Sequence, residues 1–285
     1  MSAMSGQEPE QFAENGKVRL LRRRSKARVS LRHRMPAEKL RRGVYLIPSL
    51  FTAGNLMCGF FSIIATFNGE FIDAALFIIL ANILDGIDGY AARLTKTVSR
   101  FGVEFDSLAD VVSFGVAPAV LVYLWALVPW QTWGWLAACT YVVCGALRLS
   151  RFNVQAQGVS KSHFVGLPIP AAAQMITSTV ILYYYLGGAG SPSRHVTLLL
   201  VIYGLAALMV SSVPYFSLKN NDIKRRHPIW MLVSGIILIT LFIAERHLMF
   251  FTVVLLYTLS GPLLWCLTTY KHQRERRREP AQASP

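Results

Sequence analysis

The sequence predicts an all-α, polytopic membrane protein, a helical bundle with about eight transmembrane helices, and three observations lead to this fold class. First, 53% of the 285 residues are hydrophobic and the mean hydropathy is +0.41, which excludes a disordered chain and is unusual for a water-soluble domain. Second, apolar runs long enough to cross about 30 Å of hydrocarbon recur along the chain. Third, nearly all basic residues fall between these runs or at the chain ends, as in membrane proteins.

Eight apolar runs are expected to span the membrane. They cover residues 44–66, 71–93, 107–129, 132–150, 165–187, 195–213, 228–245 and 248–269. The loops between them are short, and only a tight turn separates the last two. We therefore expect one helical membrane domain, preceded by a basic juxtamembrane arm at 1–43 and followed by a basic tail at 271–285. The arm is expected either to be disordered or to lie on the membrane surface as an amphipathic helix.

The positions of the basic residues predict the orientation. Of the 29 Lys and Arg, 27 lie in the arm, in the loops after the second, fourth and sixth runs, or in the tail. Only Arg194 and Arg246 lie in the intervening loops. Since basic residues accumulate on the cytoplasmic side, an even number of spans places both termini there. The net charge of +14 then indicates anionic membrane lipids as partners, and no nucleic acid, because no recognised nucleic-acid motif is present.

The stretch 84–110 holds four aspartates, in a chain that has only 15 acidic residues. Asp85 and Asp88 are three residues apart on the second predicted helix, and Asp106 and Asp110 are four apart at the start of the third. Both spacings place the side chains on one helical face. Consecutive helices are usually antiparallel neighbours, so the two acidic faces are expected to meet near the cytoplasmic end. Because carboxylates are costly inside a membrane, this cluster indicates a functional site.

Four converging carboxylates repel one another and require positive charge. Hard divalent cations prefer oxygen ligands, and Mg²⁺ is often held by carboxylates together with substrate phosphates. Two such ions would balance four negative charges and could polarise a phosphoryl oxygen. Gly86 and Gly89 remove bulk from the same stretch, and Arg93 supplies a group for phosphate. The spacing alone therefore favours metal-dependent phosphate chemistry, with an ion-transport pathway as the alternative.

Two motifs carry a family resemblance. They are Asp85-x-x-Asp88-Gly89-x-x-Ala92-Arg93 and, after eight intervening residues, Gly102-x-x-x-Asp106-x-x-x-Asp110. Together they resemble the signature of the CDP-alcohol phosphatidyltransferase family. Further segments are similar to the integral-membrane bacterial phosphatidylserine synthases of that family: FTAGNLMCGF at 51–60, EFDSLADVVSFGVAPA at 104–119, ALRLSRFNV at 146–154 and GLPIPAAA at 166–173.

The resemblance implies a fold, a reaction and a location. It implies a catalytic core at 44–215, with 216–270 as an additional C-terminal helix pair. The implied enzyme transfers the phosphatidyl group of CDP-diacylglycerol to the hydroxyl of L-serine and releases CMP, in phospholipid biosynthesis. It implies the bacterial inner (cytoplasmic) membrane, a cytoplasmic active site and a homodimer.

The resemblance also implies roles for individual residues. It implies metal binding, by Mg²⁺ or Mn²⁺ as two ions, at Asp85, Asp88, Asp106 and Asp110, with Asp110 also the general base. It implies contacts with CDP-diacylglycerol at Thr52, Asn55, Gly89, Arg93 and Ser99. Arg148 and Arg151, at the end of the fourth predicted helix, are candidates for the serine carboxylate, because guanidinium geometry matches a carboxylate.

Three other hypotheses stay open from the sequence. A sister enzyme of the same family would use glycerol 3-phosphate or an inositol phosphate as acceptor and would want a denser basic pocket. A divalent-cation transporter would use the aspartates as a pathway, but it predicts acids spread through the membrane depth. A noncatalytic scaffold would act through the basic arm and would leave the four aspartates unexplained.

Overall fold

A computed structural model of the chain describes residues 49–95, 99–157, 166–190, 194–213, 215 and 244–278. Within these ranges the chain is helical apart from turns and short connections, which confirms the predicted all-α membrane fold. Three helical stretches are long and apolar enough to cross a membrane: Ser49–Phe67, Phe101–Trp130 and Arg246–Cys266. The predicted arm at 1–43 and residues 228–243 of the seventh predicted span lie outside the described residues.

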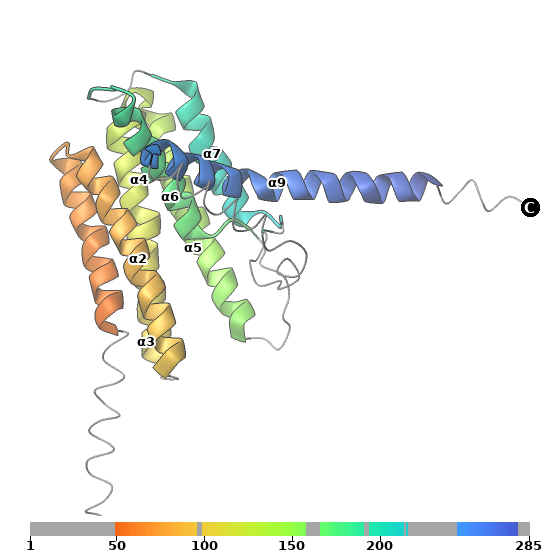
Figure 1. Ribbon diagram of the computed structural model, residues 1–285, viewed down its shortest axis with the longest axis horizontal. Coiled ribbons are helices and arrows are strands. Elements are labelled where there is room, and N and C mark those ends of the chain that lie inside the picture. Colours follow the sequence, from red (N-terminus) through yellow and green to blue (C-terminus); the bar gives the residue numbers. More distant parts are fainter. Residues whose placement is uncertain are drawn as a thin grey trace, which may run out of the picture.

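The described elements follow one another in a simple order. They are Ser49–Phe67, which we call the first helix, α2 (Phe71–Thr95), α3 (Arg100–Asp110), η1 (Val111–Val116), α4 (Ala117–Val122), η2 (Tyr123–Leu127), η3 (Val128–Trp130), α5 (Thr132–Gln157), α6 (Ile169–Tyr185), α7 (Val196–Val210) and α9 (Arg246–Arg278). The first helix and α2 stand side by side, α5 packs on α7, and α6 packs on both α2 and α9. Figure 1 shows that α9 crosses this bundle and extends away from it.

The connection between α2 and α3 is shorter than predicted. α3 begins at Arg100, ahead of the predicted span 107–129, because Ser99 caps it. The Ser99 hydroxyl accepts a hydrogen bond from the backbone N–H of Gly102 at 2.9 Å. Such a cap satisfies a free N–H of the first turn and lets a helix start on polar residues, which hydropathy does not detect. Asp106 and Asp110 therefore both lie within a helix.

A π-helical turn, η1, follows Asp110 directly. Such turns insert a residue into a helix and often occur at functional sites. Here the widened turn is buried, and the carbonyl of Phe114 accepts a hydrogen bond from the Tyr141 hydroxyl at 3.1 Å. Pro118 sits in the first turn of α4, where a missing N–H costs little. The predicted third span is thus part of one continuous helical run. Its π-helical turn rotates the residues after Asp110 about the helix axis relative to the residues before it.

The first helix approaches η1 very closely. A Cβ atom on Gly59 would collide with the side chain of Ser113 and lie 2.8 Å from its Cα. Small residues allow such contacts between membrane helices. The Ser113 hydroxyl also donates to the carbonyl of Asn55 at 2.9 Å. This packing holds the polar side of the first helix against the segment that follows Asp110.

The start of α6 is tied to the end of α7. Gly166 has a φ of +86° and donates its N–H to Val213 O at 2.9 Å, while Leu167 N–H donates to Leu208 O at 3.1 Å. A side chain at Gly166 would be strained by this backbone conformation and would also meet Met209 O at 2.5 Å. The pairing explains why the helix predicted at 165–187 begins only at Ile169.

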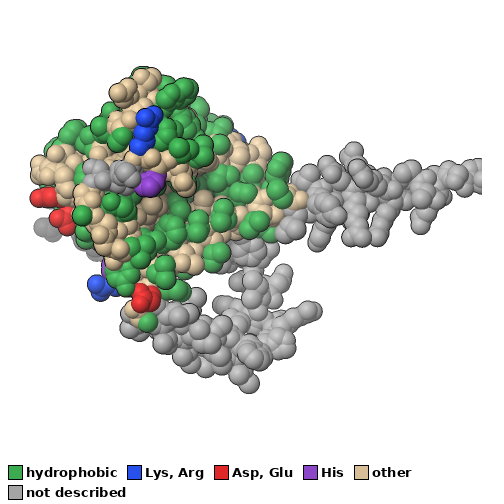
Figure 2. All heavy atoms as spheres, turned by 90° about the horizontal axis from the view of Figure 1, so that it is seen from above, with side chains coloured by type: hydrophobic (Ala, Val, Ile, Leu, Met, Phe, Trp, Pro, Cys, Tyr) green, Lys and Arg blue, Asp and Glu red, His purple; other side chains and the backbone are tan. Residues whose placement is uncertain are grey.

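The outside of the bundle is apolar. Large hydrophobic side chains such as Leu50, Phe67 and Leu256 are more than half exposed, while Trp125 and Tyr141 are buried in the core. Hydrophobic side chains also predominate among the coloured atoms in Figure 2, with few charged groups between them. A helical protein with this surface is an integral membrane protein, because lipid covers the exposed apolar area.

Candidate metal and active site

Three carboxylates meet between α2 and α3. Asp85 and Asp88 come from the C-terminal half of α2, and Asp106 comes from α3. One carboxylate oxygen from each lies within 4.8 Å of the others. Asp88 is buried, and Asp85 and Asp106 are partly buried. The two acidic faces therefore meet, as the spacing predicts.

Asp110 lies one turn beyond Asp106 and borders this cluster. Its side chain is buried, with 9% of its surface exposed, and it contacts the Asp85 carboxylate. The amide of Asn55 donates to Asp110 Oδ1 at 3.4 Å. Asp110 is thus more buried than Asp106, the other acid on α3, and a hydrogen bond from the first helix holds its side chain.

The first helix supplies neutral hydrogen-bond donors to the acids. The Thr52 hydroxyl donates to Asp88 Oδ2 at 3.0 Å, one helical turn from the Asn55 contact with Asp110. Both side chains are buried. Hydrogen bonds of this kind fix the orientation of carboxylates without neutralising them. The predicted contacts of Thr52 and Asn55 with CDP-diacylglycerol stay predictions.

The donor set fits a divalent cation. Asp106 Oδ1 is buried and has no hydrogen-bond partner among the described residues. An unpaired buried carboxylate oxygen is costly, and hard cations bind such oxygens well. Together with the carboxylates of Asp85 and Asp88, this oxygen forms a group that can hold a metal ion.

The two arginines of α5 lie in different surroundings. Arg148 is 8% exposed, its guanidinium carbon is 5.4 Å from the centre of the Phe152 ring, and it lies within electrostatic range of Tyr257 of α9, Arg151 and Asp110. Arg151 donates to the carbonyls of Val210 and Ser211, at 3.3 and 3.2 Å, where α7 ends. Arg148 is thus buried within electrostatic range of Asp110, whereas Arg151 fastens α5 to α7.

Asn153 connects α5 to α3. Its amide donates to the Ser107 hydroxyl at 2.8 Å, and that hydroxyl donates to Val103 O at 2.9 Å. Because Ser107 directly follows Asp106, this link holds α3 at the level of the carboxylates. The contact joins residues 46 positions apart, so helical spacing could not predict it.

The other predicted lipid contacts lie near the same place. Gly89 directly follows Asp88 on α2 and is partly buried. Arg93 is one turn further along α2, and its side chain is outside the described part of the structure. Ser99 caps α3, as described above. Their contacts with CDP-diacylglycerol stay predictions.

Sequence reasoning missed two polar residues near the site. Ser113 holds the backbone of Asn55, and its only signal is its place three residues after Asp110. Tyr257 lies on α9, far along the chain, and interacts with Arg148. No sequence pattern links Tyr257 to the motif residues.

Comparison with known proteins identifies related chains. The CDP-alcohol phosphatidyltransferase family matches residues 45–213. The CDP-diacylglycerol–serine O-phosphatidyltransferase of Helicobacter pylori is 39% identical over 180 residues, which cover 62% of this chain and 74% of the relative. The protein of the same name from Bacillus subtilis is 37% identical over 175 residues, covering 61% and 92%. The archaetidylserine synthase of Methanothermobacter thermautotrophicus is 39% identical over 171 residues, covering 59% and 69%.

Proposed function

The chain belongs to the CDP-alcohol phosphatidyltransferase family, and we propose that it transfers the phosphatidyl group of CDP-diacylglycerol to the hydroxyl of L-serine and releases CMP. The observation that carries this proposal is the convergence of the Asp85, Asp88 and Asp106 carboxylates within 4.8 Å. Relatives named for the serine reaction support serine as the acceptor.

The cofactor is a divalent cation. The family generally depends on such ions, and the carboxylate cluster suits one. We propose two ions, Mg²⁺ or Mn²⁺, at Asp85, Asp88, Asp106 and Asp110. When bound, they supply positive charge to the pyrophosphate and polarise the phosphoryl group. Thr52, through its hydrogen bond to Asp88, keeps one of the ligands in place.

Asp110 serves as the general base. It accepts the proton of the serine hydroxyl while the hydroxyl oxygen forms a bond to the phosphorus of the phosphatidyl group. The bond from that phosphorus to the CMP oxygen breaks, and its electron pair leaves with CMP. The Asn55 amide, bonded to Asp110 Oδ1, orients the base for this transfer. The serine hydroxyl is a weak nucleophile, so removal of its proton is needed at neutral pH.

Arg148 binds the serine carboxylate. Its guanidinium is buried within electrostatic range of Asp110, so a serine held between the two would present its hydroxyl to the base. A charge-assisted hydrogen bond in this enclosed site provides both affinity and orientation. Arg151 is the second candidate from the sequence, although its contacts with Val210 and Ser211 favour a structural role.

The proposed setting is the inner membrane of a bacterium, with both termini and the active site at the cytoplasmic side. This orientation rests on the 27 of 29 basic residues assigned to that side. The basic arm would contact anionic lipids, and the protein would act as a homodimer. Serine and CMP are water-soluble, so a site at the cytoplasmic end gives them access while the lipid stays in the membrane.

The test is a transfer assay with purified protein. CDP-diacylglycerol and Mg²⁺ or Mn²⁺ are incubated with serine, glycerol 3-phosphate, inositol 1-phosphate or no acceptor, and CMP and lipid products are quantified. Asp110→Asn is assayed in parallel, and Asp73→Asn, in the first turn of α2, is the matched control.

Serine-dependent formation of phosphatidylserine, lost in Asp110→Asn and kept in Asp73→Asn, is the expected result. A product with another acceptor would contradict the assignment of serine and of Arg148. Folded protein that releases no CMP with any acceptor would overturn the proposal and move the transporter and scaffold hypotheses ahead of it.

A further inference from the structure

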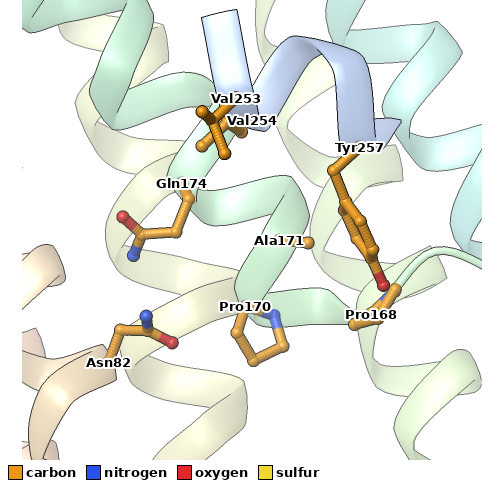
Figure 3. A pocket seen from close by; sticks show the side chains of 8 residues that line it. All are labelled: Asn82, Pro168, Pro170, Ala171, Gln174, Val253, Val254 and Tyr257. Carbon is orange, nitrogen blue, oxygen red and sulfur yellow. The ribbon is translucent and has the colours of Figure 1, made fainter. Parts of the chain in front are cut away.

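A groove of about 400 Å³ lies between α2, α6 and α9, and its lining residue Asn82 is one helical turn from Asp85 on α2. Figure 3 shows its walls: Asn82 from α2, Pro170 and Gln174 from α6, and Val253, Val254 and Tyr257 from α9. The lining is mostly apolar, and none of its described residues carries an acidic or basic side chain. The α9 wall lies outside the residues 45–213 that match the family.

Gln174 places an unpaired hydrogen-bond donor at this groove. Its side chain is only 7% exposed, and its Nε2 has no hydrogen-bond partner among the described residues. Its Oε1 has one contact, from the Thr177 hydroxyl at 3.5 Å. Leaving a buried amide N–H unpaired costs free energy that an apolar side chain would avoid. A ligand atom that accepts a hydrogen bond would remove this cost.

The position of the groove indicates which part of a lipid would supply this hydrogen-bond acceptor. Asn82 precedes Asp85 by three residues, so it lies roughly 4.5 Å further along the axis of α2. In a diacylglycerol phosphate, the ester carbonyls are a few bonds from the phosphorus. A lipid whose phosphate reached the carboxylates would therefore have an ester near Asn82 and Gln174. In Figure 3 the amide groups of these two residues lie on the same side of the groove.

We propose that this groove binds an acyl chain of the CDP-diacylglycerol substrate, and that Gln174 Nε2 donates a hydrogen bond to its ester carbonyl. The inference rests on the proposed function. The chain would lie against Val253 and Val254 of α9, which supply the apolar surface. A zwitterionic amino acid fits poorly, because the groove offers it no opposite charges. The α9 wall makes the C-terminal helix part of the lipid site.

The experiment compares two lipids that differ only at this contact. CDP-diacylglycerol has ester carbonyls, whereas a CDP-dialkylglycerol of equal chain length has ether oxygens and no carbonyl. Gln174→Met keeps the length of the side chain and removes the donor. Thr179→Val is the control. Among the described residues the Thr179 hydroxyl bonds only within α6, to Met175 O at 2.6 Å, and Thr179 is not part of the groove lining.

We expect the wild type to show a KM for the diacyl lipid about threefold to tenfold below that for the dialkyl lipid, as one net hydrogen bond predicts. Gln174→Met should raise the diacyl KM by the same factor and leave the dialkyl KM unchanged. Thr179→Val should keep the wild-type preference. Equal KM values for the two lipids in the wild type, or equal effects of Gln174→Met on both, would overturn the inference.

A binding measurement separates this inference from the proposed function. Native mass spectrometry without serine gives the relative affinity of each protein for the two lipids. No phosphatidylserine from either lipid would contradict the proposed function, and active enzyme with no diacyl preference would contradict the groove alone. Should Gln174→Met fail to fold, Asn82→Leu, on the α2 wall of the groove, should reduce the same preference. An unchanged preference in that variant would also overturn the inference.

Discussion

The carboxylate wall of the site, on α2 and α3, and the arginine wall, on α5, are built differently. The acids converge, and neutral donors from the first helix hold them. Arg148 and Arg151 are three residues apart, as are Asp85 and Asp88, yet their guanidinium groups have different partners. Arg151 is drawn to the C-terminal carbonyls of α7, which lack partners within their own helix. Equal spacing therefore gives a common function only where the neighbouring helix offers a common partner.

The carboxylate wall should show the largest effect. Asp110→Asn keeps the shape of the side chain and removes the base, so we expect kcat to fall by about 10²- to 10⁴-fold. Steady-state assays of CMP release measure this fall. The control Asp73→Asn, in the first turn of α2, should keep a kcat within twofold of the wild-type value. If Asp110→Asn kept most of its activity, another group would have to remove the serine proton.

Substitutions of the two arginines in the arginine wall should give two different phenotypes. Arg148→Gln should raise the KM for serine by about 10- to 100-fold, because it removes a charge-assisted hydrogen bond. Arg151→Gln should leave that KM near the wild-type value and lower the melting temperature, since it removes contacts with Val210 and Ser211. Serine titrations and thermal unfolding test the pair together. Equal increases in the KM for serine in the two variants would contradict the separate roles of the two arginines.

The donors of the first helix should have a smaller effect, expressed through the metal. Thr52→Val removes the hydrogen bond to Asp88 and should raise the Mg²⁺ or Mn²⁺ concentration for half-maximal activity by about tenfold. Thr66→Val is the matched control, because within the described part of the chain the Thr66 hydroxyl bonds only to Ser62 O on the same helix. A metal titration shifted equally in both variants would mean that Thr52 does not position a ligand.

The link between the two walls should have the smallest effect. Asn153→Ala removes the hydrogen bond to Ser107 and should lower stability by about 1 kcal/mol, with a loss of kcat of only a few fold. Val154→Ala, at an exposed neighbouring position, is the control. Thermal unfolding and kcat are measured on both. A large rise in the serine KM of Asn153→Ala alone would instead assign Asn153 to the substrate.

Much of the fold could be predicted from the sequence. The membrane helices follow from apolar runs, since only continuous apolar segments are stable in hydrocarbon. The meeting of the acidic faces follows from helical spacing and from the short connection between α2 and α3. Helix boundaries were less accurate. The cap at Ser99 and the pairing of Gly166 with Val213 set them, and hydropathy contains neither signal.

By itself, the sequence determined which residues share a helical face and that four acids would gather in a membrane helix pair, because both depend on contacts between near neighbours in the chain. Only the tertiary structure decided which arginine is bound to the end of α7, which donors hold the acids and which amide lines the groove. Those outcomes depend on close contacts between helices far apart in the chain. Gly59 against Ser113 and α6 against α9 are examples, and a repeating pattern within one helix cannot specify such neighbours.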